Sequence, residues 1–186
     1  AFHHGSGFGK AGCVDRTVLR DGQGMPYLAG SAIKGRLRHA AVRVLLARGE
    51  GKVCQYGDAK GVCRGEEACP VCRLFGSPVR RGSLRFGDAY PAGEASAILG
   101  SIHEGGKGRL LPGDSTVRTS TAVDRRRGVV KEHLLYSTET LPAGLVFEAE
   151  VSGDLGAEDL RVLGEACRVL THFGADGARG LGRCCW

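Results

Sequence analysis

The sequence predicts an α+β fold, and the character of five segments carries that prediction. Apolar residues recur at helical spacing over residues 31–48 and again over roughly 157–171, so each segment would form a helix with one buried face. Residues 144–151 alternate apolar and polar side chains, which is typical of a half-buried strand. Residues 84–86 and 117–123 share this strand character.

The order of the expected elements is strand, helix, strands, strand, helix, strand. The chain begins with the character of a strand end and closes with that of a strand cut off. This order favours an RRM-like (ferredoxin-like) sandwich with long insertions. A length of 186 residues fits a single domain, 1–186, and a hydrophobic content of 42% suffices for a core. The 31 Gly and only 6 Pro predict many tight turns rather than disorder.

The first helix begins at a Gly-Ser turn and is strongly basic. Ser31 is a candidate N-cap, because its hydroxyl can accept a hydrogen bond from a free amide of the first turn. Lys34, Arg36 and Arg38 follow closely. A helix N-terminus with exposed amides, a hydroxyl and nearby cations is suited to bind phosphate. The alternative interpretation is a core-packing helix with a solvated basic rim.

The second helix has Asp154 as a candidate cap, and a glycine-rich loop at residues 174–183 follows it. Arg179 and Arg183 suit this loop to contact nucleic acid. The loop lacks the Gly-Lys-Ser/Thr ending of a phosphate-binding loop, and it does not follow a strand as a dinucleotide fingerprint requires. The expected buried stripe of the helix consists of Leu160, Leu163, Cys167 and Leu170.

A hairpin is expected in the middle of the chain. Residues 117–123 and 129–136 would form its strands, and residues 124–128 its turn. Arg125 and Arg126 then lie at the tip. The tip is either a solvated turn or a basic finger that contacts nucleic acid.

Charge and hydropathy exclude some classes of protein. The formal net charge of +6 modestly favours a polyanionic partner. No apolar run approaches the roughly 20 residues of a membrane span, and no N-terminal stretch is typical of a secretory signal. The chain begins without Met and ends on Arg-Cys-Cys-Trp, so we expect a trimmed chain or one piece of a larger polypeptide.

Four of the 8 Cys cluster in a segment of residues 49–81 that has the character of an insertion. Four thiolates can close a tetrahedral zinc site, and the Cys-x2-Cys half has the usual spacing of a zinc knuckle. Such a site would be structural, because four sulfurs leave no open position for water. The alternative is a set of buried or redox-active thiols. The candidate ligands are Cys54, Cys63, Cys69 and Cys72.

Asp15 lies in a glycine-rich loop between residues 8 and 26 that has few apolar residues. A lone Asp in such a loop is usually a turn former, so this residue alone does not indicate catalysis. The six His are scattered, and the sequence pairs none of them with a nucleophile and a carboxylate.

Taken together, these features resemble the RAMP superfamily, and within it the backbone subunit of type III CRISPR effector complexes. Five motifs that span nearly the whole chain occur in the order of the family. They are Phe2-His3-His4-Gly5-Ser6-Gly7; the loop 12–15 with 18–21; the helix start 25–38; Cys69 to Gly76 with Gly82 to Ala89; and the glycine loop 178–183. Ala29 and Ala32 depart from the Pro-Gly-Ser-Ser-Leu-Lys-Gly pattern of the family's helix start.

The resemblance implies an RRM-like palm that carries a four-cysteine zinc element at 49–81 and a β-hairpin thumb within approximately 91–136. It implies copies of the subunit in a filament along a CRISPR guide RNA, together with other effector subunits or domains, in the cytoplasm of a prokaryote and away from any membrane. The chain is short for a free-standing member, so it is expected to be a reduced subunit or one domain of a fused effector.

The resemblance also assigns roles to residues. The target would be a single-stranded RNA that pairs with the guide. Asp15 would cleave this paired target at regular intervals with Mg²⁺ or a similar divalent ion. The guide backbone would be held by Ser31, Lys34, Arg36 and Arg38, and further RNA contacts would come from Arg125, Arg126, Arg179 and Arg183. Two alternatives stay open: a non-catalytic scaffold of the same fold, and a metal-independent guide-processing ribonuclease with His39 and His133 as candidate residues.

Overall fold

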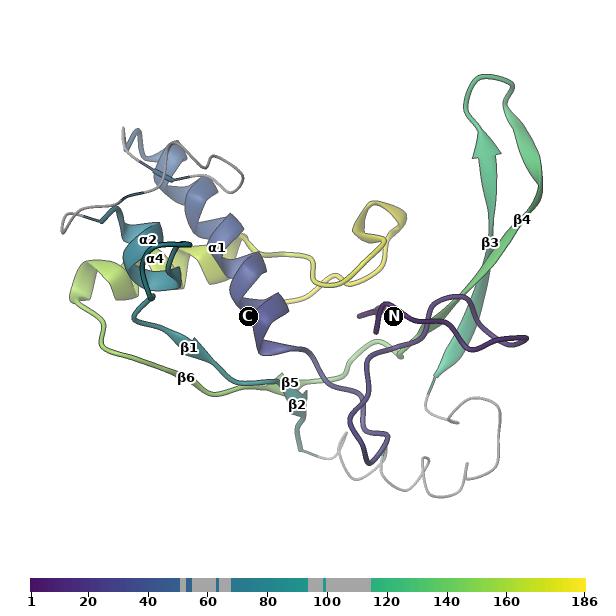
Figure 1. Ribbon diagram of the computed structural model, residues 1–186, viewed down its shortest axis with the longest axis horizontal. Helices are drawn as coiled ribbons and strands as arrows, with labels where there is room; N and C mark the ends of the chain where they lie inside the picture. The colour runs from purple at the N-terminus through teal and green to yellow at the C-terminus, as the bar shows by residue number, and fades with distance from the viewer. Residues whose placement is uncertain (51–52, 55–62, 64–67, 94–98, 100–114) are drawn as a thin grey trace. The chain divides into compact units, whose positions relative to one another are not determined.

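The computed structural model describes residues 1–50, 53–54, 63, 68–93, 99 and 115–186 (Figure 1). Within these residues the fold combines helices and short antiparallel strands, as an α+β fold requires. The elements in chain order are α1 (Gly30–Ala47), α2 (Pro70–Phe75), β1 (Arg85–Phe86), β2 (Tyr90–Pro91), β3 (Thr116–Asp124), β4 (Val129–Thr140), β5 (Phe147–Glu148), β6 (Val151–Ser152), α4 (Ala157–Val169) and the 3-10 turn η1 (Gly177–Arg179).

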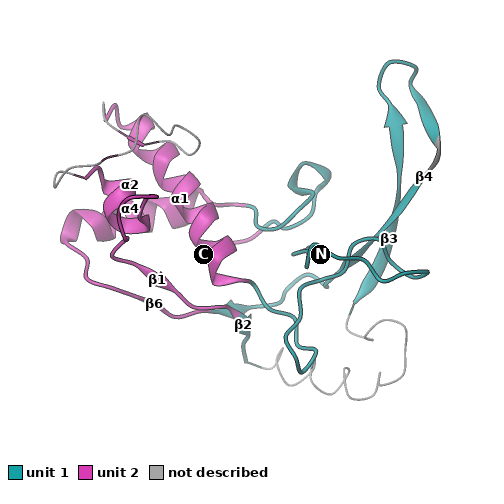
Figure 2. Cartoon of the chain, viewed as in Figure 1, with its two compact units in different colours: residues 1–28, 90–148, 172–183 teal, residues 29–89, 149–171, 184–186 magenta. Residues whose placement is uncertain are grey.

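The chain forms two compact units, each assembled from separated segments (Figure 2). Unit 1 comprises residues 1–28, 90–148 and 172–183, and unit 2 comprises residues 29–89, 149–171 and 184–186. The parts of the expected insertions at 51–52, 55–62, 64–67, 94–98 and 100–114 lie outside the described residues. No helix in the described part of the chain is long and apolar enough to cross a membrane.

Unit 2 is built on α1, which packs against α2, α4 and β1. The predicted helix 31–48 is confirmed to within one residue at either end. Arg48, directly after α1, forms an ion pair of 3.0 Å with Glu158 and a second with Glu165, and so ties α1 to α4. The buried face of α1 consists of Gly30, Ile33, Leu37, Ala40, Ala41, Val44 and Leu45.

The helix expected at 157–171 is present as α4, but its expected buried stripe is partly wrong. Leu160 is 61% exposed, whereas Val162 and Asp159 on the neighbouring face are buried. The face is rotated because the carboxylate of Asp159 accepts hydrogen bonds from Arg73 Nε at 2.9 and 3.1 Å. The expected cap is also wrong, since α4 follows Gly156 and no side chain caps it.

The strands expected outside the hairpin are shorter than predicted. The single strand expected at 144–151 is divided into β5, which pairs with β2, and β6, which pairs with β1. The strands expected at the two ends of the chain form only isolated bridges, such as Phe2 with Leu141 and His172 with Arg183. Glycines with φ between +72° and +88° at positions 7, 12, 174, 180 and 182 interrupt an extended backbone there.

Unit 1 contains the longest ladder, the antiparallel hairpin β3–β4 (Figure 1). The expected strands are confirmed, and both are longer than predicted. Asp124 fixes the turn, because its Oδ1 accepts the N–H groups of Arg126 at 2.9 Å and Arg127 at 3.2 Å. The last residues of β4 are buried, whereas Val129 and Val130 near the tip are exposed.

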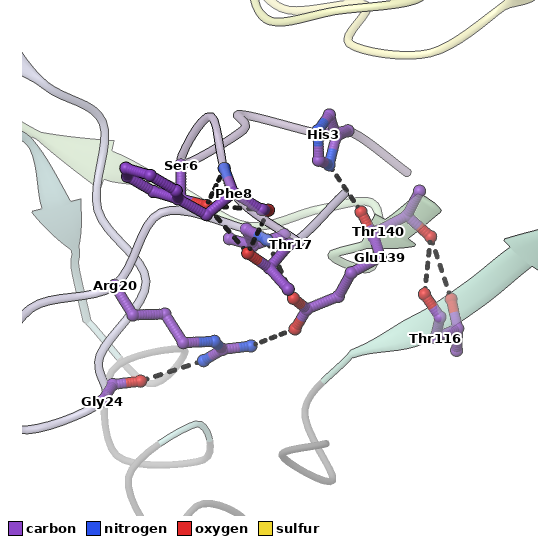
Figure 3. Close-up of polar contacts among 10 residues, drawn as sticks. His3, Ser6, Phe8, Thr17, Arg20, Gly24, Thr116, Glu139 and Thr140 are labelled. Atoms are coloured by element: carbon purple, nitrogen blue, oxygen red, sulfur yellow. Dashed lines mark hydrogen bonds and ion pairs between the residues drawn. The ribbon is translucent and has the colours of Figure 1, made fainter. Parts of the chain in front are cut away.

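A buried carboxylate holds the N-terminal segment against the base of β4 (Figure 3). Glu139 accepts hydrogen bonds from the N–H of Val18 at Oε2 and from Arg20 Nη2 at Oε1, each at 2.8 Å. Its main-chain carbonyl accepts a hydrogen bond of 2.7 Å from Nδ1 of buried His3. Burial would raise the pKa of Glu139, but the hydrogen bonds from Arg20, Ser115 and Val18 together lower it.

Candidate functional site

Asp15 and Ser137 are joined by three hydrogen bonds in unit 1. The main-chain N–H of Ser137 donates to Asp15 Oδ2 at 2.7 Å, and the Ser137 hydroxyl donates to the same oxygen at 2.9 Å. In return, the N–H of Asp15 donates to Ser137 Oγ at 3.1 Å. The two Ser137 donors, the backbone one foremost, lower the pKa of the exposed Asp15 carboxyl.

The backbone on either side of Asp15 positions this carboxylate. A tight loop precedes it, closed by hydrogen bonds between Lys10 and Val14 of 2.7 and 3.0 Å. After it, Arg16 pairs in parallel with β4: its N–H donates to the Ser137 carbonyl at 3.1 Å, and its carbonyl accepts from Glu139 at 2.9 Å. The carboxylate therefore sits at a fixed point along the edge of β4.

Asp15 opens onto a hollow of about 500 Å³ that residues 9–15 and Ser137 line. Asp15 is the carboxylate among these lining residues. Mg²⁺ in proteins is typically held by one or two carboxylates together with substrate phosphates. The one exposed carboxylate of this hollow could supply a single ligand of such a donor set.

Two arginines converge on one tyrosine beside this pair. The guanidinium carbons of Arg16 and Arg179 lie 5.2 and 5.6 Å from the ring centroid of Tyr136, the residue before Ser137. Arg179 also donates to the Tyr136 hydroxyl. Asp176 pairs with both arginines, at 3.4 Å to Arg16 and 3.3 Å to Arg179.

The four cysteines of the expected zinc element come together in unit 2. All four are buried, and their sulfurs lie within 4.8 Å of one another. The edge of a tetrahedron of four sulfurs around zinc is about 3.8 Å, so this cluster has the size and the donors of a structural zinc site. Cys69 lies directly before α2 and Cys72 lies within it. The set consists of Cys54, Cys63, Cys69 and Cys72.

The thiols of this cluster differ in their pKa values. Burial raises the pKa of the Cys54 thiol to about 12. The N–H of Cys69 donates to Cys63 Sγ at 3.4 Å and lowers the pKa of Cys63 to about 7. A divalent cation would supply the positive charge that four buried thiolates need.

Ser31 is not the N-cap of α1, so that expectation is wrong. The N-cap is Ala29, and the exposed Ser31 lies within the first turn. The N–H of Gly30 instead donates to the carboxylate of Asp88 at 2.7 Å. The helix start therefore already has an anionic partner, because Gly30 must lie against β1 and brings its amide within reach of Asp88.

The basic residues expected to bind RNA fall into three places. On α1, Arg36 is exposed and Lys34 is half-buried, while Arg38 donates to the Gly76 carbonyl at 2.5 Å. At the tip of the hairpin and in the glycine loop of unit 1, the exposed residues are Arg125, Arg126, Arg179 and Arg183. His39 is exposed on α1, and the side chain of His133 lies outside the described residues.

The sequence profile of the RAMP superfamily (RAMPs) matches residues 2–185, which is nearly the whole chain. The chain belongs to the RAMP superfamily. This membership agrees with the five motifs that first indicated it and with a fold of mixed helices and strands.

Curated relatives of this RAMP chain include two proteins named CRISPR system Cms endoribonuclease Csm3. The one from Methanocaldococcus jannaschii is 25% identical over 94% of this chain and 68% of its own length. The one from Methanothermobacter thermautotrophicus is 26% identical over 94% of this chain and 73% of its own length.

Solved structures share the fold of this RAMP chain. A chain of type III-B Cmr-beta bound to cognate target RNA superposes with a TM-score of 0.60 at 14% identity, over 97% of this chain and 90% of that one. A chain of type III-B Cmr-beta in the apo state superposes with a TM-score of 0.61 at 12% identity, over 98% of this chain and 91% of that one. At these identities the similarity establishes the fold.

Sequence reasoning missed the partners of Asp15 in this RAMP domain. Ser137 lies 122 residues away in a strand where serine is unremarkable. Arg16 adjoins Asp15, but its partners Tyr136 and Asp176 lie in a different strand and a different loop. The parallel pairing of Arg16 with β4 brings these residues together, and a periodicity analysis does not reveal such pairing.

Proposed function

We propose that this chain is a guide-RNA-binding backbone subunit of a type III CRISPR ribonucleoprotein and that it cleaves complementary target RNA through Asp15. The observation that carries the proposal is the ionised Asp15 carboxylate held at the edge of an open hollow. Membership of the RAMP superfamily and two relatives named as Csm3 endoribonucleases support it.

The chemistry follows from the position of one carboxylate. Asp15 acts on a target nucleotide displaced from the guide–target duplex. There the ribose 2′-hydroxyl loses its proton and attacks the adjacent phosphate, and the P–O5′ bond breaks, which leaves a 2′,3′-cyclic phosphate and a 5′-hydroxyl. Mg²⁺ or a similar divalent ion supplies positive charge for the phosphorane-like transition state when it is bound. Asp15 holds that ion or orients the attacking hydroxyl. Either role requires a charged carboxylate, and the lowered pKa of Asp15 is consistent with that charge at neutral pH.

RNA contacts are divided between the two units. On α1, the guide backbone is held independently of sequence by the side chains of Ser31, Lys34, Arg36 and Arg38. In unit 1 the contacts come from Arg125, Arg126, Arg179 and Arg183. The β3–β4 hairpin is the thumb that separates the duplex at regular intervals, and its basic tip supports this role. A zinc ion on Cys54, Cys63, Cys69 and Cys72 stabilises unit 2.

The proposed partners follow from the same role. They are a CRISPR guide RNA, a target RNA, other effector subunits or domains, and copies of this chain arranged in a filament. A complex of this kind works in the prokaryotic cytoplasm, where free thiols persist and zinc thiolates are stable. The chain serves either as a free subunit or as one domain of a fused effector.

The test is target cleavage by a complex reconstituted with guide RNA. We expect Asp15→Ala to reduce the cleavage rate by about 100-fold or more while assembly and target binding persist. Asp154→Ala, at an exposed position in unit 2, is the control and should cleave normally. Loss of target binding in Asp15→Ala would refute the catalytic role.

The same assay separates the alternatives. A wild-type complex that binds target but never cuts it in Mg²⁺ indicates a non-catalytic scaffold. Cleavage that survives EDTA indicates a metal-independent ribonuclease, for which His39→Ala and His133→Ala would be the next variants.

A further inference from the structure

We propose that Ser137 is the positioning residue of Asp15, and that it dedicates Oδ2 to the protein so that Oδ1 is the oxygen that meets the substrate or its metal ion. This inference rests on the proposed function. It starts from the two donors of Ser137, its N–H and its hydroxyl, which both meet Oδ2 at 2.7 and 2.9 Å. Neither bond uses Oδ1.

The position of Ser137 at the edge of β4 explains why its main-chain N–H donates to Asp15. At Ser137 the strand is bonded to β3 on one side, while its N–H and carbonyl serve the N-terminal segment on the other. The carbonyl accepts from Arg16, and the N–H donates to Asp15. The Asp15 carboxylate thus takes the place that a carbonyl of a third strand would occupy in a regular ladder.

The hydroxyl of Ser137 adds orientation to this bond. A single hydrogen bond would fix the distance of the carboxylate but would let its plane turn. A second donor from a different direction fixes the plane, and the return bond from the Asp15 N–H to Oγ holds the hydroxyl in its donor rotamer. An exposed loop carboxylate therefore keeps one conformation at the hollow that Asp15 lines, with Oδ2 occupied by Ser137.

The test compares serine variants in the guide-loaded complex under single-turnover conditions. Ser137→Ala removes the hydroxyl and keeps the N–H, and we expect it to slow cleavage by about tenfold or more with target affinity unchanged. Ser137→Thr retains the hydroxyl and suits a strand, so it should restore most of the rate. Ser120→Ala on the partner strand β3 is the matched control and should behave as wild type.

The outcomes separate this inference from the proposed function. Equal rates for Ser137→Ala and Ser120→Ala, with Asp15→Ala inactive, would overturn the role of Ser137 alone. An active Asp15→Ala would overturn the proposed function, and this inference with it. A raised Mg²⁺ requirement in Ser137→Ala, absent in Ser137→Thr, would support positioning over a merely structural role, which would leave the metal dependence unchanged.

A separate observation carries a second inference, which also rests on the proposed function. We infer that Arg16 and Arg179 form one binding site for an RNA phosphate, assembled on Tyr136 and held by Asp176. Two exposed guanidinium groups near one ring repel each other electrostatically. This repulsion is offset by the π face of Tyr136 and by the carboxylate of Asp176, which pairs with both arginines.

The pair retains capacity for a ligand. The side chains of Arg16 and Arg179 are 48% and 55% exposed, whereas that of Asp176 is only 17% exposed. Each guanidinium has five N–H donors and gives few of them to Asp176 and Tyr136, so these half-exposed groups retain donors for phosphate oxygens. Asp176 has a φ of +58°, a conformation uncommon outside glycine, and it is the one non-glycine residue of the described chain with positive φ.

The salt dependence of target binding tests this site. Arg16→Gln with Arg179→Gln should lower the slope of log affinity against log salt by about 1 to 2, as the loss of phosphate contacts requires. Arg161→Gln with Arg168→Gln, which neutralises two exposed arginines of unit 2, is the charge-matched control. Equal slopes for the two double variants would overturn the inference. Absence of RNA binding by the wild-type complex would instead overturn the proposed function.

Discussion

The main-chain N–H of Gly30 donates a hydrogen bond of 2.7 Å to the carboxylate of Asp88. A carboxylate at this position stabilises α1 through the positive end of the helix dipole. It also occupies the point where a phosphate would approach the first amide. Any contact between α1 and an RNA backbone therefore falls on the side chains of the basic face rather than on the amide of Gly30.

Glycine is required at position 30 because its backbone lies directly against β1. The same close approach brings its N–H within reach of Asp88. A Cβ at Gly30 would lie 2.5 Å from the carbonyl oxygen of Phe86 and 2.6 Å from that of Gly87. We expect Gly30→Ala to lower the free energy of unfolding by about 1–3 kcal/mol, because the backbone of β1 must move. Gly35→Ala, in the same helix with nothing within 4 Å of the new Cβ, should raise it by about 0.5–1 kcal/mol. Urea unfolding of both variants measures the difference, and equal effects would contradict the close packing.

The cysteine cluster predicts one zinc ion per chain. Elemental analysis should return about one equivalent, and Cys69→Ser with Cys72→Ser should abolish it. The unfolding temperature should fall by about 10 °C or more on chelation, because α2 begins between these ligands. Cys185→Ser, at an exposed cysteine outside the cluster, should keep both zinc and stability. Zinc-free protein from a zinc-containing medium would refute the site.

The buried pair of Arg20 and Glu139 predicts a large coupling energy. Their side chains are 13% and 2% exposed, so Glu139→Gln leaves an uncompensated cation and should cost about 3–5 kcal/mol. Arg20→Met added to Glu139→Gln should recover part of this loss, and a double-mutant cycle measures the coupling. Arg161→Met, which breaks an exposed pair with Glu158, should cost less than about 1 kcal/mol. Additive losses at Arg20 and Glu139 would show that the pair is not coupled.

We expect unit 1 to lose stability as the solution is acidified, because the folded state disfavours protonation of His4. Burial beside Phe173, and secondarily the neighbouring His3, lowers the pKa of His4 below 6.5. The unfolded chain then binds the proton more readily, so this contribution is fully present above pH 6.5 and is lost as the pH falls through 6.5 towards the folded-state pKa. Unfolding at pH 7.5, 6.5 and 5.5 should show the decline, and His4→Gln should flatten it. An unchanged slope in His4→Gln would assign the decline to another group.

Glu139 affects the stability of unit 1 in a lower pH range than His4 does. Its pKa lies below 4.5, so its contribution is present above pH 4.5 and is lost only as the pH falls below that value. The two groups therefore act in separate pH windows, which the same series extended to pH 3.5 distinguishes.

The predictable part of this molecule is the part that local pattern determines. The helix α1 and the hairpin β3–β4 follow from helical spacing, alternation and the Asp124 turn, all within a few residues. The rotation of α4 does not follow, because Asp159 is buried by a partner, Arg73, that lies 86 residues away. An amphipathicity analysis assigns a carboxylate to the solvent and cannot include that ion pair.

The candidate site, too, is predictable from the sequence only where local pattern determines it. The Cys-x2-Cys spacing places two ligands together locally, whereas the meeting of all four cysteines depends on tertiary contacts. Resemblance alone indicates Asp15, since a glycine-rich loop carries no periodic signal. Ser137 became visible only through the pairing of Arg16 with β4, because Ser137 otherwise has the features of any strand serine.

The order in which unit 1 is completed follows from its closing contacts. The carbonyl of His3 accepts from the N–H of Ala175 at 2.9 Å, and that of Ala1 accepts from Gly182 at 3.1 Å. Segments 1–28 and 172–183 of the unit are thus tied together, which requires closing a loop of more than 170 residues. Until residues 172–183 have emerged from the ribosome, the segment that carries Asp15 lacks these contacts. A nascent chain is therefore expected to carry Asp15 well before unit 1 is closed, and the proposed cleavage would have to wait until the glycine loop has been made.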